Sequence, residues 1–194
     1  MNVIAVNGSA RRQGNTARLI EGVLEPLRAA GHACEHVELA GLDVRGCTAC
    51  GACRTRADGR CHGRDDDANA IIERILAADA VILGSPTYFA DVTAEMKALI
   101  DRTGYVSRGN GNLLARKPGA AVVAVRRAGA IHAFDTINHF FLIGEMLIVG
   151  SSYWNVGVGG AKGEVEQDAE GMTTMHRLGE NMAWLLARLD GSGD

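Results

Sequence analysis

The chain has 194 residues and a formal net charge of −3, and 47% of its residues are hydrophobic. This length and composition predict one globular domain and exclude a disordered chain, and the weakly acidic balance argues against nucleic acid as a partner. No apolar run reaches the roughly 18 residues of a membrane span, and the N-terminus lacks a signal-peptide pattern, so we expect a cytoplasmic protein with reduced thiols.

Apolar runs and helical periodicity alternate along the chain. Buried strands are predicted at 2–9, 32–39, 79–85 and 119–125, with a fifth within 147–158. Amphipathic helices are predicted at 15–30, 65–78, 93–104, 132–147 and 166–189. Strands that alternate with helices are typical of a parallel sheet covered on both faces. The expected architecture is therefore α/β, with one domain over 1–194 and a cysteine-rich loop at 46–64.

The first strand leads into a glycine-rich loop, "NGSARRQGNT" at residues 7–16. It carries side chains that can bond an anion, namely Ser9, Arg11, Arg12, Asn15 and Thr16. Free backbone N–H groups at the start of the following helix attract an anion in the same place. The Walker A and dinucleotide fingerprints are both absent, so one terminal phosphate is the better fit. A glycine-rich turn with a capped helix remains the alternative.

Four of the five cysteines follow in a compact segment, with the spacing Cys47-x2-Cys50-x2-Cys53-x7-Cys61. A [4Fe–4S] cluster, a zinc ion and free or redox-active thiols are the candidates, and disulfides are the weakest explanation in a reducing compartment. Three cysteines at successive three-residue steps match the wrap around a cubane. Structural zinc sites more often use two Cys-x2-Cys pairs about a dozen residues apart. The spacing favours iron over zinc and leaves the thiol alternative open.

The loop "GSPTYFADV", residues 84–92, follows the third predicted strand. Pro86 cannot continue a central strand, and Tyr88 and Phe89 place aromatic rings at the edge of the sheet. Alone, this loop is better explained as a hydrophobic cap, although a flat heteroaromatic ring would find an apolar wall there. In the flavodoxin-like strand order 2-1-3-4-5, FMN binds between strands 1 and 3, where the order reverses. Because the two loops follow these two strands, together they predict an FMN site.

These segments, with "VAVRRAGAIHAFDTINHF" and "SSYWNVGVGGAKGEVE", resemble the NAD(P)H-dependent FMN reductase branch of the flavodoxin-like proteins. The resemblance implies a doubly wound, five-stranded parallel sheet, with FMN as cofactor and NAD(P)H as co-substrate. It assigns the FMN phosphate to the first loop, at Ser9, Arg11, Gly14, Asn15 and Thr16. It assigns the isoalloxazine ring to the second loop and to the loop after strand 4, at Pro86, Thr87, Tyr88, Phe89 and Arg126–Gly129.

The iron–sulfur flavoprotein subgroup of that family carries a compact four-cysteine motif that binds a [4Fe–4S] cluster. The resemblance therefore implies that the ligands here are Cys47, Cys50, Cys53 and Cys61. Other relatives have similar cysteines with no established cluster, so the resemblance leaves the metal undecided.

The resemblance implies a flavoenzyme that moves electrons from a small-molecule or protein donor through FMN to an acceptor, with no side chain required as acid or base. Arg126 or Arg127 is the candidate for stabilising negative charge at the ring's pyrimidine edge. An electron carrier that docks a ferredoxin-like protein and a metal-binding or sensing protein without flavin are the alternatives. The apolar stretch at 134–149, with Tyr153 and Trp154, predicts a homodimer or homotetramer.

Overall fold

The computed structural model describes residues 1–191, in which six strands form one parallel sheet. The strands are β1 (Asn2–Asn7), β2 (Ala33–Glu38), β3 (Ala80–Pro86), β4 (Pro118–Val125), β5 (Leu147–Ile148) and β6 (Val156–Val158). The helices are α1 (Asn15–Ala29), α2 (Ala52–Arg56), α3 (Ala68–Ala77), α4 (Ala94–Gly109), α5 (Ala130–Ile143) and α6 (Ala169–Leu189), with a 3-10 turn η1 at Glu164–Gln167. None of the helices within residues 1–191 has the length and apolarity to cross a membrane.

The strand order is β2-β1-β3-β4-β5, which confirms the predicted order 2-1-3-4-5. The central strands form because their residues are continuously apolar, and every residue of β4 is buried. The strand expected within 147–158 is two short strands that both pair with β4, one near each of its ends. Between them the chain leaves the sheet, and the Asn155 side chain donates to the carbonyl of Ala121 at 3.0 Å. The sheet therefore has a sixth strand that the pattern did not predict.

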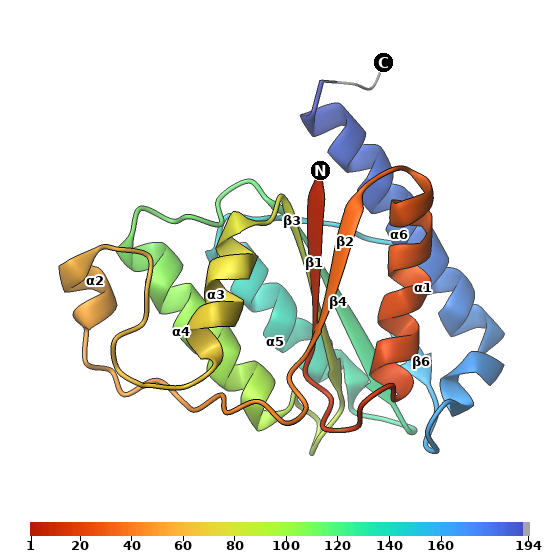
Figure 1. Cartoon of the computed structure of the whole chain (residues 1–194). Coiled ribbons are helices and arrows are strands. Elements are labelled where there is room, and N and C mark those ends of the chain that lie inside the picture. The colour runs from red at the N-terminus through yellow and green to blue at the C-terminus, as the bar shows by residue number, and fades with distance from the viewer. Residues whose placement is uncertain (192–194) are drawn as a thin grey trace.

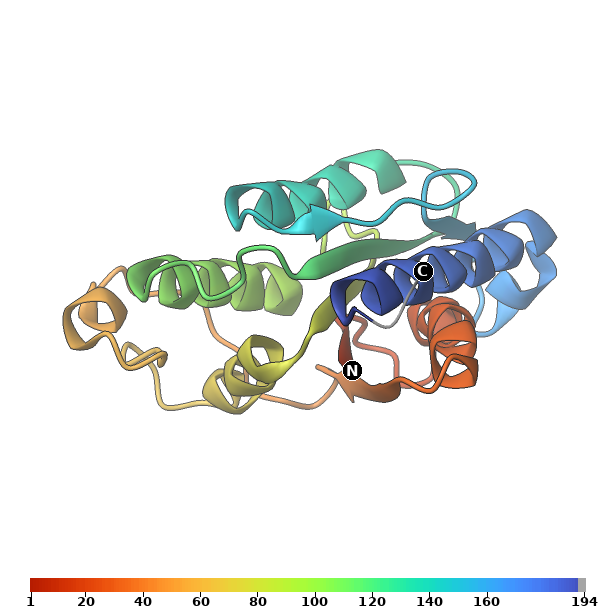
Figure 2. The ribbon, with the colours of Figure 1, turned by 90° about the horizontal axis from the view of Figure 1, so that it is seen from above.

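Helices cover both faces of the sheet, as predicted for alternating strands and helices. In Figure 1, α1 and α6 lie on one side of the sheet, and α3, α4 and α5 lie on the other. Two separate clusters of buried apolar side chains correspond to these two layers. In Figure 2, α2 lies beyond α4, at the end of the molecule away from α1.

Glycine permits the closest contact between the two helices of one layer. Gly179 of α6 lies against α1, where an added Cβ would lie 2.3 Å from the carbonyl oxygen of Val23 and 2.4 Å from Cγ of Pro26. Pro26 lies inside α1, which runs on to Ala29. The helix expected at 93–104 continues to Gly109, and Gly104 lies opposite Phe140 within it.

The segment expected to be a loop at 46–64 contains one short helix, α2, between Ala52 and Arg56. Gly51 precedes it with φ at +71°, a left-handed conformation that glycine adopts without steric cost. The segment leaves the sheet after β2 and returns to it through α3, so it projects beside α4 (Figure 2).

Candidate functional site

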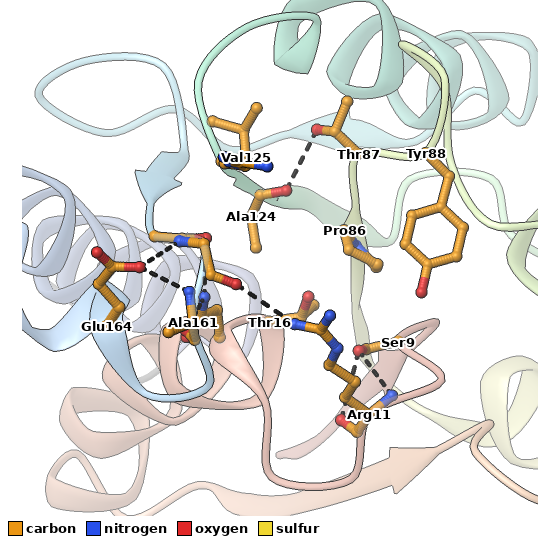
Figure 3. A pocket seen from close by; sticks show the side chains of 14 residues that line it. Ser9, Arg11, Thr16, Pro86, Thr87, Tyr88, Ala124, Val125, Ala161 and Glu164 are labelled. Carbon is orange, nitrogen blue, oxygen red and sulfur yellow. Dashed lines mark hydrogen bonds between the residues drawn. The ribbon is translucent and has the colours of Figure 1, made fainter.

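A cleft of about 570 Å³ opens at the carboxyl edge of the sheet, where β1, β3, β4 and β6 end. Three loops and the end of β4 surround it, as Figure 3 shows. Its lining residues are Ser9, Arg11, Asn15, Thr16, Pro86, Thr87, Tyr88, Ala124, Val125, Arg126, Gly159, Gly160, Ala161 and Glu164. Eight residues assigned by resemblance therefore line one cleft, and the third loop, 159–164, joins them.

The start of α1 forms one end of the cleft. Gly14 caps the helix without any side-chain hydrogen bond, so the first backbone N–H groups of α1 are left for an outside acceptor. A Cβ at Gly14 would lie 3.0 Å from the carbonyl oxygen of Arg11, which explains glycine at this tight turn. Thr16 is buried, and its Oγ1 has no hydrogen-bond partner among residues 1–191. A buried hydroxyl without a partner, beside free N–H groups at a helix N-terminus, is an arrangement that can bind an anion.

The loop before α1 is held by its own serine. The Ser9 hydroxyl accepts the backbone N–H of Arg11 at 3.1 Å, and the Ser9 N–H donates to the side-chain oxygen of Asn7. The two arginines of the loop point to different partners. Arg11 donates across the cleft to the carbonyl of Gly160, whereas Arg12 donates to the carbonyl of Ala40 outside it. Of these two arginines, Arg11 is the one that lines the cleft.

Asn15 lines the cleft, but its amide already has partners in the third loop. Its Nδ2 donates to the carbonyls of Gly159 and Ala161, both at 2.9 Å. Its Oδ1 accepts the N–H of Gly163 at 2.8 Å. The side chain ties the third loop to the start of α1, so its contribution to the cleft is the position of that loop.

Glu164 is a cleft residue that sequence reasoning missed. Its Oε2 accepts the N–H groups of Ala161 and Gly160, each at 2.6 Å (Figure 3). These two N–H groups hold the pKa of Glu164 below its ordinary value. The glycine-rich string "GVGGAKGE", which begins within the last strand, was the signal that could have identified this loop.

The second loop forms the opposite wall. The Thr87 backbone N–H and hydroxyl both donate to the carbonyl of Ala124, at 2.8 and 3.2 Å, and so fix the loop against β4. Tyr88 is half exposed and lines the cleft, while the side chain of Phe89 is fully exposed and does not line it. Arg126 lines the cleft, whereas Gly129 lies against Ala90 just outside it. The predicted roles of Phe89 and Gly129 stay predictions.

The four cysteines line a second cavity of about 340 Å³, and no residue lines both this cavity and the cleft. Cys47 and Cys50 are exposed, Cys53 is half buried and Cys61 is buried. The N–H of Ala52, with the hydroxyl of Thr48, lowers the pKa of the Cys50 thiol. Within residues 1–191, no three His, Cys, Asp or Glu side chains are arranged as ligands of one metal ion.

Arg102 of α4 also lines the cysteine cavity and is completely buried. Its Nε donates to the sulfur of Cys61 at 3.3 Å, and its Nη1 bonds the carboxylate of Asp66 at 2.6 Å. Burial is the largest single influence on both groups and opposes their charges. Together, however, the bonds from Asp66 and Cys61 raise the pKa of Arg102, and the bonds from Arg102 and the N–H groups of Arg45 and Ala68 lower the pKa of Asp66. Sequence reasoning did not single out this arginine, because a charged residue in a helix is usually solvated, although its neighbours one turn away, Ala98, Leu99 and Val106, are buried.

Comparison with known proteins points to flavin chemistry. The family described as NADPH-dependent FMN reductase matches residues 1–161. An iron-sulfur flavoprotein of Methanocaldococcus jannaschii is 35% identical over 94% of this chain and 96% of its own length. An iron-sulfur flavoprotein of Methanosarcina thermophila is 31% identical over the full length of both chains.

Solved structures support the fold. The structure of RosB with bound 8-demethyl-8-formylriboflavin-5'-phosphate has a TM-score of 0.76 at 17% identity, and the match covers 100% of this chain and 82% of RosB. An archaeal flavodoxin has a TM-score of 0.62 at 16% identity, covering 94% and 96% of the two chains. At these identities the likeness establishes a flavodoxin-like fold alone.

Proposed function

The chain belongs to the NADPH-dependent FMN reductase family, and we propose that it passes electrons from NAD(P)H or a reduced protein through FMN to an acceptor. Family membership supports an FMN-dependent oxidoreductase. The observation that carries the proposal for this chain is the unpartnered Thr16 hydroxyl, buried at the start of α1 inside a cleft between the loops of β1 and β3.

In the proposed complex the FMN phosphate lies at the start of α1. Thr16 donates its hydroxyl, the first N–H groups of α1 face the phosphate oxygens, and Arg11 adds positive charge. The Ser9 hydroxyl keeps the loop in the shape that this requires. These donors fit a dianionic group, because no acidic side chain other than Glu164 lines the cleft within residues 1–191, and Glu164 is already bonded by two N–H groups.

The isoalloxazine ring is proposed to lie between the second loop and the end of β4. Pro86 and Tyr88 offer apolar and aromatic surface on one side, and Val125 offers apolar surface on the other. Arg126 is positioned in the same cleft to favour negative charge on the ring's edge. FMN supplies the electron and hydride transfer when bound, while the chain orients it and limits its contact with water.

The four cysteines are proposed to hold a [4Fe–4S] cluster through Cys47, Cys50, Cys53 and Cys61. They fit, because all four line one cavity. In a cubane each iron takes one cysteine, so the four sulfurs lie farther apart than the ligands of a single ion. No three potential ligands within residues 1–191 surround a single ion, so the preference for iron over zinc is based on the spacing of the cysteines. Free or redox-active thiols remain the competing explanation.

Two separate cavities, each proposed to hold a redox group, also favour a second candidate, an electron carrier without a substrate of its own. Such a carrier would exchange electrons with a ferredoxin-like protein. Steady-state oxidation of NADH or NADPH with a quinone as acceptor separates the two functions, because a carrier lacks this turnover.

We also propose a homodimer or homotetramer. Apolar side chains at the end of α5, on β5 and in the following loop are exposed to solvent in the single chain, namely Leu142, Ile143, Leu147, Ile148, Tyr153 and Trp154. An exposed apolar surface of this kind marks a protein–protein contact. A mass measured at micromolar concentration by light scattering is expected to be two or four times that of the chain.

The function is tested by purifying the protein without oxygen and identifying its bound groups. The proposal predicts one FMN per chain, released on denaturation, and a broad visible absorbance with iron and sulfide in equal amounts. A colourless protein that does not bind added FMN contradicts the flavin assignment. Protein with FMN but with one zinc and no iron contradicts the cluster and leaves the flavin assignment intact.

A further inference from the structure

Arg102 is a charged side chain buried in the wall of the cysteine cavity. It lies in the middle of α4, and none of its surface is exposed. A guanidinium carries its charge at any physiological pH, so burying it costs free energy unless the surroundings supply compensating groups. The groups that surround Arg102 therefore indicate the role of its buried charge.

The compensation is incomplete. Nη1 bonds Asp66 at 2.6 Å and the carbonyl of Arg45 at 3.0 Å, and Nε bonds the sulfur of Cys61 at 3.3 Å. Nη2 has no partner among residues 1–191, although it is buried. A guanidinium with a spare donor beside a thiol cavity has room for one more electronegative neighbour.

The bonded groups also lie where the cysteine segment begins and ends. Arg45 directly precedes residues 46–64, and Asp66 follows them closely. Cys61 is the one cysteine of the four that is buried. One guanidinium thus anchors both ends of the segment and touches its innermost sulfur.

A purely structural role explains this arrangement poorly. Replacing a buried ion pair by well-packed apolar side chains is often neutral or stabilising, so packing alone gives no reason to keep the pair. The sulfur contact and the unpartnered donor are explained if the cavity holds an anion. Four thiolates make such an anion, and a nearby cation favours its more reduced, more negative form.

We propose that Arg102 is the fixed counter-cation of the group held by the four cysteines and the positioning residue for Cys61. Asp66 and the carbonyl of Arg45 hold the guanidinium in place, and Nε donates to the Cys61 sulfur. The inference rests on the proposal that the cysteines hold an iron–sulfur cluster. It adds that the reduction potential of the cluster depends on this buried arginine. The exposed arginines of residues 46–64 cannot replace it, because solvent screens their charge.

Three variants of the anaerobically purified protein test the idea, and Arg102→Lys is a fourth, conservative variant. Arg102→Met removes the buried positive charge, and Asp66→Asn removes its negative partner while leaving the arginine in place. Arg108→Gln removes an exposed arginine from the last turn of the same helix and is the matched control. The readouts are iron, sulfide and FMN per chain, and the reduction potential of the cluster followed by electron paramagnetic resonance.

Of the two buried variants, only Arg102→Met is expected to lower the potential. Arg102→Met is expected to lower the reduction potential by at least about 59 mV. For a one-electron couple this is a tenfold change in the ratio of reduced to oxidised cluster. Asp66→Asn raises it or leaves it unchanged, and Arg108→Gln leaves it unchanged. A purely structural role predicts that both buried variants lose stability and shift the potential in the same direction, which overturns the inference.

Loss of the cluster in Arg102→Met is informative as well. A Met variant that retains FMN but no iron, beside an iron-loaded Asp66→Asn, supports the inference, and partial recovery of iron in Arg102→Lys strengthens it. Iron loss in both buried variants overturns it. If the wild type contains the cluster and Arg102→Met leaves its reduction potential unchanged, this inference alone is overturned. If the wild type contains no iron, the proposed cluster and this inference are both overturned.

Discussion

Replacing Thr16 by valine is expected to stabilise the flavin-free protein and to weaken FMN binding. The two side chains have nearly the same shape, and the methyl group of Thr16 that packs near Gly84 is kept. The hydroxyl is buried without a partner in the single chain, a situation that costs about 1–3 kcal/mol. Removing it is expected to raise the free energy of unfolding by about 1 kcal/mol, or the melting temperature by about 2–4 °C for a chain of this size.

The effect on FMN has the opposite sign. A hydrogen bond to a charged phosphate contributes about 1.5–3 kcal/mol, so its loss weakens FMN binding roughly 10- to 150-fold. Flavin fluorescence quenching gives the dissociation constant, and calorimetry gives the melting temperature with and without FMN. The melting temperature of the wild type rises more with added FMN than that of the variant, because ligand stabilisation follows affinity.

Thr103 supplies the matched control. It is also buried, its Oγ1 also lacks a partner among residues 1–191, and it lies on α4, where it does not line the cleft. Thr103→Val should raise the melting temperature in the same way and leave FMN affinity unchanged. Equal FMN affinity in wild type and Thr16→Val would refute the assignment of this hydroxyl to the phosphate.

Three further predictions follow from other parts of the chain. Cys50→Ala should remove the iron while leaving one FMN per chain, because the cleft and the cysteine cavity share no lining residue; metal and flavin analysis measures both. Gly179→Ala should destabilise the chain by about 1–3 kcal/mol in urea unfolding, because its Cβ would collide with α1; an unchanged midpoint would contradict the packing. Glu164 has a lowered pKa, so its stabilising effect is present above the ordinary pKa of Glu and is lost as pH falls through the folded value. In Glu164→Gln the free energy of unfolding should therefore fall less than in the wild type as the pH is lowered. An equal fall in the two proteins would contradict this.

Much of the fold is predictable from the local pattern of apolar residues along the sequence. β1 and β3 are continuous apolar runs, each followed by a loop with glycine or proline, and parallel strands bring such loops to one edge of the sheet. The division of the last edge strand was not predictable. The division coincides with Asn155, whose side chain donates to the carbonyl of Ala121 in β4 in place of a backbone hydrogen bond between strands. A contact between residues so far apart in the chain does not appear in the periodicity of the sequence.

The candidate site was predicted only where its residues follow a strand that the sequence pattern had located. The third loop was missed because its place is set by the bonds of Asn15 to Gly159 and Ala161, residues far along the chain. Arg102 was missed because a charged residue in a helix is usually solvated, and its burial depends on Asp66 and Cys61 together.

The most direct measurement of the central claim compares the affinities of the wild-type protein for FMN and riboflavin. The two ligands differ by the phosphate, and the account places that phosphate on the Thr16 hydroxyl and the free N–H groups of α1. Two charge-assisted bonds of about 1.5 kcal/mol or more each predict that FMN binds at least a hundredfold more tightly than riboflavin. Equal affinity for the two ligands would contradict the account.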